Sequence, residues 1–259
     1  MTVQTMSWSD LLRPLRQQRT GKIIEETFGE GRSPFQKDAD KIIFSSSFRR
    51  LGKKTQVHPL VENDHIHTRL SHSLETSCVG RSLGMKVGSL LSKELPQPSL
   101  SPTHIGEIVQ AACLAHDIGN PPFGHAGEEA IREWFKAELK ESSYEEMKSG
   151  CKTDFILFDG NALGFRVLTQ TEYDTFEGGM RLSFPTLATM MKYPWSSLKA
   201  EETGTLKFSC FSSEIDIMNN IAVRLGMTPK GDNCWCRHPL SYLVEAADDI
   251  CYLLVDLED

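Results

Sequence analysis

The pattern of apolar and polar positions along the chain is mainly helical. Apolar residues recur every three or four positions over most of its length, a spacing that places them on one face of an α-helix. Together with capping residues and with glycines and prolines that stop helices, it predicts helices over 34–50, 67–91, 102–117, 125–139, 160–170, 184–192, 213–226 and 239–257. Loops are predicted over 140–158 and 195–210, with short strands near 180–184 and 206–211. The pattern therefore predicts an all-α fold with, at most, short strands.

Three glycines lie inside the helix predicted over 67–91. Gly80, Gly84 and Gly88 are four residues apart, so they share one face of that helix. Glycine inside a helix costs roughly 1 kcal/mol relative to alanine. A face that keeps glycine at this spacing is expected to pack closely against a neighbouring helix.

The composition is that of a folded protein with one domain. The chain has 259 residues, of which 39% are hydrophobic, enough to fill one large helical core or two small ones. It contains no internal repeat and no low-complexity tract, so a single domain is predicted over 1–259. No apolar run approaches the roughly 20 residues that cross a bilayer, and the N-terminus lacks the basic and apolar regions of a secretory signal. A cytoplasmic protein without membrane contact is therefore expected.

Charge and cysteine content exclude some classes of protein. The net charge of −7 argues against a chain whose main task is to coat nucleic acid, although residues 49–54 are locally basic. The seven cysteines, an odd number, do not form a disulfide framework and are expected to be reduced. Cys234 and Cys236 lack the second ligand pair that a structural zinc site needs, so zinc is a minor hypothesis.

A histidine and an aspartate lie next to each other where the helix predicted over 102–117 ends. His116 continues the apolar stripe of this helix and is expected to face the core. A lone histidine in that position is usually an ordinary core residue, but Asp117 would cost several kcal/mol to bury without a partner. A hydrogen-bond cage or a cation would satisfy the pair. Asp248 lies in a similar position within the apolar stripe of 239–257.

A second histidine completes a candidate metal site. His72 lies mid-helix between Arg69 and Glu75, which concentrates titratable groups on one face, although such a face could also be ordinary solvated surface. Two imidazoles and two carboxylates would come from His72, His116, Asp117 and Asp248. This N2O2 set suits Mn²⁺, Fe²⁺, Ni²⁺ or Co²⁺, and Mg²⁺ less well, and it leaves positions for water and a phosphate oxygen. Open positions indicate a catalytic site.

His125 and Glu128 form a candidate proton-transfer pair. They lie one turn apart at the start of the helix predicted over 125–139, so they can share a face and hydrogen-bond. Alternatively, His125 caps the helix and Glu128 complements its dipole, and the pattern alone favours this second interpretation.

Four segments around these residues carry a resemblance to a known family. They are Thr68–Glu75 (TRLSHSLE), His116–Glu128 (HDIGNPPFGHAGE), Asp159–Ala162 (DGNA) and Glu245–Tyr252 (EAADDICY). The order of the histidines and aspartates in them resembles the H…HD…D pattern of HD-domain phosphohydrolases. The surrounding sequence resembles the deoxynucleotide triphosphohydrolase (dGTPase-like) branch over nearly the whole chain. In that branch the metal ligand of the last segment is the aspartate directly after alanine, which is Asp248 here. The implied fold is an all-α HD-domain helical bundle.

The resemblance implies a metal-dependent hydrolysis of dNTPs, dGTP among them. In this family water attacks the α-phosphorus and releases a deoxynucleoside and tripolyphosphate. His125 and Glu128 match the family's catalytic pair, which reverses the preference between their two interpretations, and Asn120 matches a polar position that faces the phosphates. The implied cofactor is a divalent metal ion: Mn²⁺, Mg²⁺, Ni²⁺, Co²⁺ or Fe²⁺.

The resemblance also implies the residues that contact the substrate. The phosphate contacts are Arg69, Lys192 and Tyr193, and the sugar contacts are Gln56, Tyr252 and Asp256. An aromatic ring against C2′ would leave no space for a 2′-hydroxyl and would select deoxyribose. The alternatives are that the two cations are ordinary surface residues and that the aromatic ring of Tyr252 belongs to the core.

Partners and rival functions complete the expectations. The resemblance implies a homo-oligomer, a hexamer or a tetramer, and allows single-stranded DNA binding. Family members continue beyond residue 259, so this chain is expected to lack a C-terminal part of the family. The rivals are an HD-type nucleotide phosphatase or phosphodiesterase, and a non-catalytic protein that binds nucleotide or single-stranded DNA.

Overall fold

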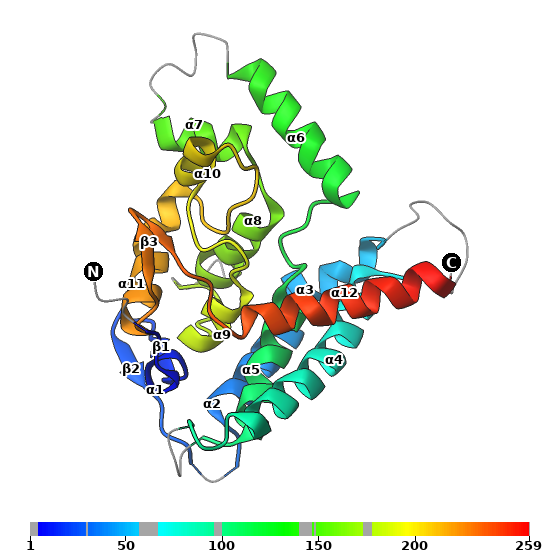
Figure 1. Cartoon of the computed structure of the whole chain (residues 1–259). Helices are drawn as coiled ribbons and strands as arrows, with labels where there is room; N and C mark the ends of the chain where they lie inside the picture. Colours follow the sequence, from blue (N-terminus) through cyan, green and yellow to red (C-terminus); the bar gives the residue numbers. More distant parts are fainter. Residues whose placement is uncertain are drawn as a thin grey trace.

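The computed structural model describes residues 5–29, 31–56, 67–95, 100–139, 147, 149–172 and 178–258. In chain order the helices are α1 (Trp8–Leu11), α2 (Pro34–Ile43), α3 (Ser46–Arg50), α4 (Arg69–Leu90), α5 (Pro102–Ala115), α6 (Gly124–Glu138), α7 (Ser149–Ile156), α8 (Gly160–Arg166), α9 (Phe184–Met190), α10 (Ser197–Thr203), α11 (Ile215–Arg224) and α12 (Ser241–Glu258). Single turns of other helix types are η1 (Leu51–Lys53), η3 (Val167–Thr171) and η4 (Ser212–Glu214). Helices dominate the described chain, so the all-α prediction is confirmed (Figure 1).

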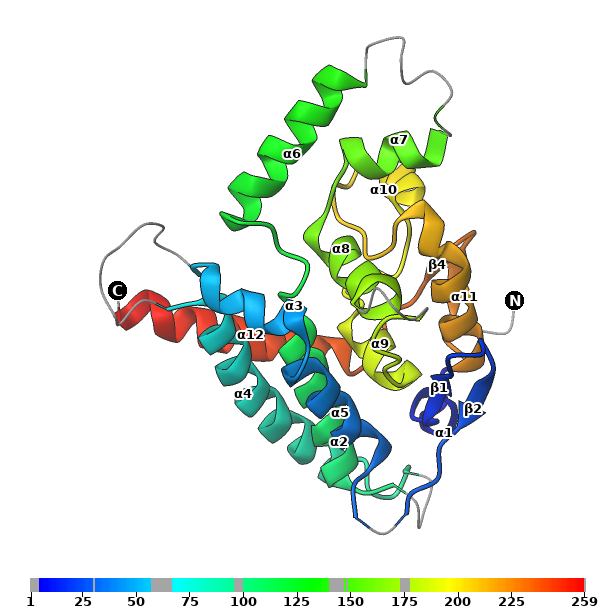
Figure 2. The ribbon, with the colours of Figure 1, turned by 180° about the vertical axis from the view of Figure 1, so that it is seen from behind.

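The hydrophobic core is built around α5. Ile105, Ile108 and Val109 on this helix have no exposed surface. A helix that is apolar on most of its circumference must be covered on several sides. The helices that contact it are α4, α2, α9 and α12, and Figure 2 shows α4, α5 and α2 side by side.

The glycines of α4 allow it to approach α5 closely, as their spacing predicted. A Cβ atom at Gly84 would lie 2.9 Å from the Cα atom of Gly106, and one at Gly88 would lie 2.7 Å from the Cα atom of Pro102. A Cβ at Gly80 would lie 2.5 Å from the Sγ atom of Cys113. These gaps are too small for any side chain, so the helix-weakening glycines are compensated by packing.

The helix predicted over 34–50 is interrupted, which corrects that prediction. α2 ends at Ile43, and Ser45 then caps the separate helix α3, with its hydroxyl accepting a hydrogen bond from the Phe48 amide at 3.1 Å. Serine hydroxyls bind nearby backbone groups and so favour caps over helix interiors. At the start of α2, Ser33 caps the helix by accepting from the Gln36 amide at 3.0 Å, as predicted.

Both predicted loops contain a helix, so these two predictions are wrong. α7 lies within 140–158 and α10 lies within 195–210. Buried Asp154 on α7 joins them, because its carboxylate accepts hydrogen bonds from the Ser197 hydroxyl and from the Ser212 amide, the latter at 3.0 Å. These short helices depend on tertiary polar contacts more than on an apolar stripe, which is why periodicity missed them.

The strands lie elsewhere than predicted. β1 (Leu15–Gln17) pairs antiparallel with β2 (Ile23–Glu25), and β3 (Pro229–Gly231) pairs with β4 (Cys234–Trp235). The predicted ranges 180–184 and 206–211 contain only isolated bridges, from Ser183 to Arg16 and from Cys210 to Ser196. A single bridge does not make a strand, so the two strand predictions are wrong.

Two further expectations concern the whole chain. All seven cysteines are free, as expected. Among the helices of the described ranges, none combines the length and the hydropathy needed to cross a membrane. The single-domain assignment over 1–259 stays a prediction.

Candidate metal centre and active-site pocket

His72, His116 and Asp117 converge although they come from different parts of the chain. His72 lies on α4, His116 is the C-cap residue of α5, and Asp117 follows it in the next turn. One ligand atom of each residue lies within 4.8 Å of those of the other two. Asp248 on α12 reaches the same place, since its Oδ1 atom lies 2.9 Å from His72 Nε2 and 3.5 Å from His116 Nε2.

The two imidazoles are buried with nitrogens free to bind a cation. The Nδ1 atom of His116 lies 2.6 Å from the Cys113 carbonyl oxygen, to which it donates, so the lone pair is on Nε2. This Nε2 atom is buried without a hydrogen-bond partner and lies 3.5 Å from Asp117 Oδ1. His72 is fully buried. An unpartnered nitrogen beside two carboxylates is the arrangement that a metal ion satisfies.

Electrostatics at this centre favour positive charge. Burial lowers the pKa of His116, but the carboxylates of Asp117 and Asp248 outweigh burial and raise this pKa to about 9. Burial raises the pKa of Asp248, whereas its hydrogen bond with His72 and the positive charges of His116 and His72 bring it well below its ordinary value. A divalent ion supplies the same positive charge and competes with protons for the imidazoles. The donor set therefore fits a metal ion.

Arg69 and Asn120 orient the Asp117 carboxylate. The Arg69 guanidinium donates to Asp117 Oδ2 at 2.7 Å, and the Asn120 side-chain amide donates to Asp117 Oδ1. Arg69 is 9% exposed, so the alternative of an ordinary surface cation is wrong for this residue. Fixed by two donors, Asp117 keeps one orientation toward the histidines.

The segment between α5 and α6 makes a tight turn against α8. A Cβ at Gly119 would lie 2.1 Å from the Gly160 carbonyl oxygen, so only glycine fits. Phe123 has a positive φ of 66° and precedes α6 as its N-cap residue. The Lys54 ammonium donates to the Asn120 carbonyl oxygen and holds the turn from the other side. This turn carries the chain from the metal centre to His125.

His125 and Glu128 form the expected hydrogen-bonded pair. His125 Nδ1 lies 3.0 Å from Glu128 Oε2, and the Gly160 amide donates to Glu128 Oε1 at 2.8 Å. The His125 side chain is 85% exposed, whereas that of Glu128 is 2% exposed. Burial raises the pKa of Glu128, but the hydrogen bonds from His125 and Gly160 and the charge of Lys207 lower it below its ordinary value. Because Phe123 is the N-cap, the interpretation of His125 as a cap is wrong.

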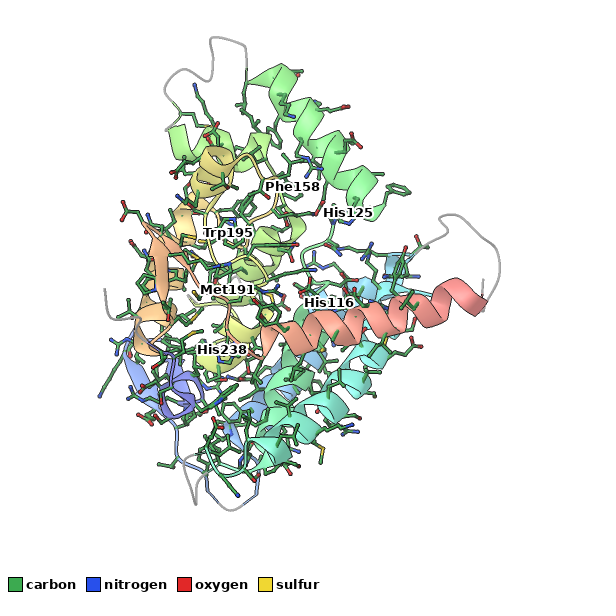
Figure 3. All side chains as sticks on the ribbon, in the orientation of Figure 1. His116, His125, Phe158, Met191, Trp195 and His238 are labelled. Carbon is green, nitrogen blue, oxygen red and sulfur yellow. The ribbon has the colours of Figure 1, made fainter. Side chains whose placement is uncertain are left out.

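A pocket of about 630 Å³ joins the metal centre and this pair. Figure 3 shows His116 beside α12 and His125 at the end of α6 nearest to it. The predicted site residues that line the pocket are Gln56, Arg69, His116, Asp117, Asn120, His125, Glu128, Lys192, Tyr193, Asp248 and Tyr252. His72 lies in the core behind them, and the side chain of Asp256 lies outside the described residues.

Several lining residues show how a ligand could be held. The Oε1 atom of Gln56 is buried without a hydrogen-bond partner. Tyr252 is 46% exposed, so it is not a core aromatic residue. The Lys192 ammonium is paired with Glu245 Oε1 at 2.8 Å, and Glu245 also binds Arg237. An anionic ligand at Lys192 would have to compete with Glu245 for this cation.

Comparison with known proteins agrees with this geometry. The family model of the HD domain matches residues 69–152. A protein of Pseudomonas aeruginosa named deoxyguanosinetriphosphate triphosphohydrolase-like is 56% identical over 256 residues, which is 98% of this chain and 57% of that protein. The chain thus contains an HD-domain match and is similar over nearly its whole length to a dGTP triphosphohydrolase-like protein. The resemblance inferred from the sequence is thereby confirmed.

Other dGTP triphosphohydrolase-like relatives match over similar lengths. One from Synechocystis is 44% identical, with 98% of this chain and 60% of the relative covered. A protein of Enterobacter named deoxyguanosinetriphosphate triphosphohydrolase is 33% identical, with 87% of this chain and 49% of the relative covered. The chain thus spans about half to three fifths of the length of these relatives.

The pocket also includes residues that were not predicted as site residues. Among them are Thr55, Asn161, Lys207 and Glu245. Thr55 is next to Gln56, which was predicted as a site residue. Asn161 and Glu245 lie inside segments that carry the family resemblance. These positions in the sequence could have indicated that the three residues belong to the site. Lys207 lies in a segment predicted as a loop and has no such indication in its local sequence.

Proposed function

We propose that this chain carries the metal-dependent hydrolytic centre of a dNTP triphosphohydrolase, which converts dNTPs, dGTP among them, to deoxynucleoside and tripolyphosphate. One observation carries the proposal: His72, His116 and Asp117 converge, and His116 and Asp117 line the same pocket as the hydrogen-bonded His125 and Glu128. Metal ligands and a proton-transfer pair facing one cavity are the two elements that phosphoester hydrolysis needs.

The metal ion would be held by His72, His116, Asp117 and Asp248. Two imidazoles and two carboxylates suit Mn²⁺, Fe²⁺, Ni²⁺ or Co²⁺, and less well Mg²⁺. When bound, such an ion polarises a phosphoryl oxygen and lowers the pKa of water. Asp117 would be kept in place by Arg69 and Asn120, which bind both of its oxygens.

His125 would transfer the proton, with Glu128 holding its ring. Hydrolysis at the α-phosphorus forms one P–O bond to water and breaks the bond to the 5′-oxygen of the nucleoside, so water loses a proton and the leaving oxygen gains one. Because Nδ1 of His125 faces Glu128, Nε2 is the ring nitrogen directed to the reactants. The exposure of this ring to the pocket supports the role.

The remaining predicted site residues would position the nucleotide. Arg69, Lys192, Tyr193 and Asn120 are the proposed contacts for the triphosphate, and Gln56, Tyr252 and Asp256 are those for the sugar. The unpartnered Oε1 atom of Gln56 fits a hydroxyl donor of the substrate. A homo-oligomer, single-stranded DNA binding and a cytoplasmic location stay predictions.

The test is to incubate the Mn²⁺-loaded chain with each dNTP and each matched NTP and to identify the products by chromatography. Deoxynucleoside plus tripolyphosphate, absent with an Asp117→Ala control, is the expected result. Orthophosphate would favour an HD-type phosphatase. Salt-dependent binding of single-stranded DNA without turnover, retained in His116→Ala, would favour the non-catalytic alternative.

A further inference from the structure

Two buried carboxylates face one ammonium group beside the His125–Glu128 pair. Glu128 is 2% exposed and Asp159 is fully buried. The Lys207 Nζ atom lies 3.5 Å from Glu128 Oε2 and 3.5 Å from Asp159 Oδ2. The three residues come from α6, from the turn before α8 and from the segment between α10 and η4.

The backbone around this group is anchored on both sides. The indole of Trp195 donates to the Lys207 carbonyl oxygen at 2.8 Å. Arg132 on α6 donates to the carbonyl oxygen of Phe158, the neighbour of Asp159, at 2.9 Å. Figure 3 shows Phe158 and Trp195 on the same side of α6, above the position of His116. The backbone at Lys207 and next to Asp159 is therefore held in place near α6 by hydrogen bonds.

The oxygens of Asp159 have different partners. Oδ1 caps α8 by accepting from the Asn161 amide and from its side chain, both at 2.7 Å. Oδ2 is buried and has no hydrogen-bond partner among the described residues. Burial raises the pKa of Asp159 and the Lys207 charge opposes that rise. Attraction to the Lys207 ammonium thus compensates the cost of burying Oδ2 without a hydrogen bond.

The distance from Lys207 to Glu128 is important for the catalytic pair. At 3.5 Å the ammonium is beyond the usual 2.7–3.2 Å range of a hydrogen bond, so it lowers the cost of burying Glu128 without direct contact. The Oε2 atom of Glu128 is then free to accept from His125 at 3.0 Å. The other cation that faces Glu128 is Arg132, at 3.8 Å from Oε2.

We propose that Asp159 is a positioning residue that acts through Lys207: it holds the ammonium between the two carboxylates, so that Glu128 keeps His125 as its partner. The inference rests on the proposed function, because His125 and Glu128 are its catalytic pair. Without the Asp159 charge, Lys207 moves onto Glu128 Oε2 and displaces the His125 Nδ1–H group.

The first experiment compares Asp159→Asn with the unaltered, metal-loaded chain. Asparagine keeps an oxygen for capping α8, but it presents an NH2 group to Lys207 and drives the ammonium towards Glu128. We expect kcat to fall at least ~10-fold, part of the ~100- to 10,000-fold that a positioned acid–base group contributes, with a smaller change in KM. The ring ¹⁵N shifts of His125 are expected to move from the Nδ1-protonated to the Nε2-protonated tautomer.

The second experiment removes the displaced cation. When Lys207 is already replaced by methionine, adding Asp159→Asn is expected to lower kcat only slightly. In this double variant His125 is expected to return to the Nδ1-protonated tautomer. If Asp159 acted only as a helix cap, the effect of Asp159→Asn would not depend on whether Lys207 is present. Asp154→Asn is the matched control, because Asp154 is a buried carboxylate on α7 that binds Ser197 and Ser212 instead. It should lower stability without changing the His125 tautomer.

The outcomes separate this inference from the proposed function. If Asp159→Asn lowers kcat equally with and without Lys207, or leaves the His125 tautomer unchanged, the positioning role is overturned even where dNTP turnover is observed. If no nucleotide is turned over, the NMR comparison still decides the positioning role, because it needs no substrate. A rise in KM alone in Lys207→Met, with no coupling to Asp159, would make Lys207 a ligand contact and refute the inference.

Discussion

The two walls of the pocket hold their functional groups by different means. The metal wall, which carries His72, His116 and Asp248, consists of the long helices α4, α5 and α12, packed through glycine and apolar residues. The dyad wall carries His125 and Glu128 on α6, and the contacts of this pair's helix with the turn before α8 and with Lys207 are polar. Helix packing thus positions the proposed metal ligands, whereas hydrogen bonds and buried charges position the proposed proton-transfer pair.

This difference has a consequence for mutation. On the metal wall a ligand is supported by many apolar contacts, so its removal should abolish binding of the ion and leave the helices in place. On the dyad wall each group depends on a few polar partners, and a single substitution can redirect a hydrogen bond.

The largest effect is expected from His116→Ala on the metal wall. It removes an imidazole whose Nε2 faces two carboxylates, and we expect Mn²⁺ binding to be lost and hydrolysis to fall by ~1,000-fold or more, equivalent to several kcal/mol. Isothermal titration calorimetry measures the binding. His104→Ala, at the opposite end of α5, is the matched control and should bind Mn²⁺ as the unaltered chain does. Undiminished binding to the His116 variant would remove this residue from the metal centre.

His125→Ala on the dyad wall should separate chemistry from metal binding. We expect kcat to fall by ~100- to 10,000-fold, because the proton-transfer group is lost, while calorimetry detects Mn²⁺ binding close to that of the unaltered chain. Steady-state kinetics with a dNTP give the first quantity. A variant that retains full kcat would exclude His125 from proton transfer and would leave the metal wall as the sole catalytic element.

Outside both walls, in the segment before α12, His238 should make stability depend on pH. It is fully buried, with Nδ1 3.3 Å from Thr189 Oγ1 and Nε2 3.2 Å from the Leu11 carbonyl oxygen. Burial lowers its pKa from 6.5 to about 4, so the unfolded chain takes up the proton first as pH falls. The free energy of unfolding therefore decreases as pH falls below the unfolded-state pKa of 6.5, by ~2 kcal/mol between about pH 7 and about pH 5.

Urea unfolding at several pH values tests this expectation, with His238→Asn as the comparison. The variant should lack this part of the pH dependence, whatever its stability at neutral pH. Equal slopes for both proteins would mean that other groups cause the acid sensitivity.

The smallest effect concerns packing within the metal wall. Gly84→Ala places a Cβ 2.9 Å from backbone atoms of α5, so one helix must shift, at a cost of about 1–3 kcal/mol, partly offset by the helix preference of alanine. Gly52→Ala is the control, since its Cβ would meet only Leu70 at 3.7 Å. Urea unfolding should rank Gly84→Ala below both the control and the unaltered chain. If Gly84→Ala is as stable as the control, close α4–α5 contact is not required.

Much of the metal wall was predictable from the sequence. The helices over 67–91 and 239–257 were located within two residues of α4 and α12, because their apolar and glycine positions repeat with the helical period. His116 and Asp117 were recognised because the histidine continues a buried stripe and an acidic residue that is costly to bury follows it directly. The family resemblance selected Asp248 over Asp249, and the structure brings Asp248 to both histidines.

Less of the dyad wall was predictable. The spacing of His125 and Glu128 allowed a pair but equally a cap, and only the resemblance changed the preference. α7 and α10 were taken for loops, and Lys207 was not considered, because these segments owe their positions to Asp154, Asp159 and Trp195, which are distant in sequence.

The sequence by itself determined the helical class, the glycine face of α4 that packs closely against a neighbouring helix, and the residues able to bind a metal ion, since periodicity and residue chemistry are local properties. The tertiary structure alone decided that Arg69 is buried against Asp117, that Lys207 lies between Glu128 and Asp159, and that His125 faces the pocket. These contacts join segments far apart in the chain. Their energy depends on burial and on charges a few ångströms apart, and neither is encoded in the spacing of neighbouring residues.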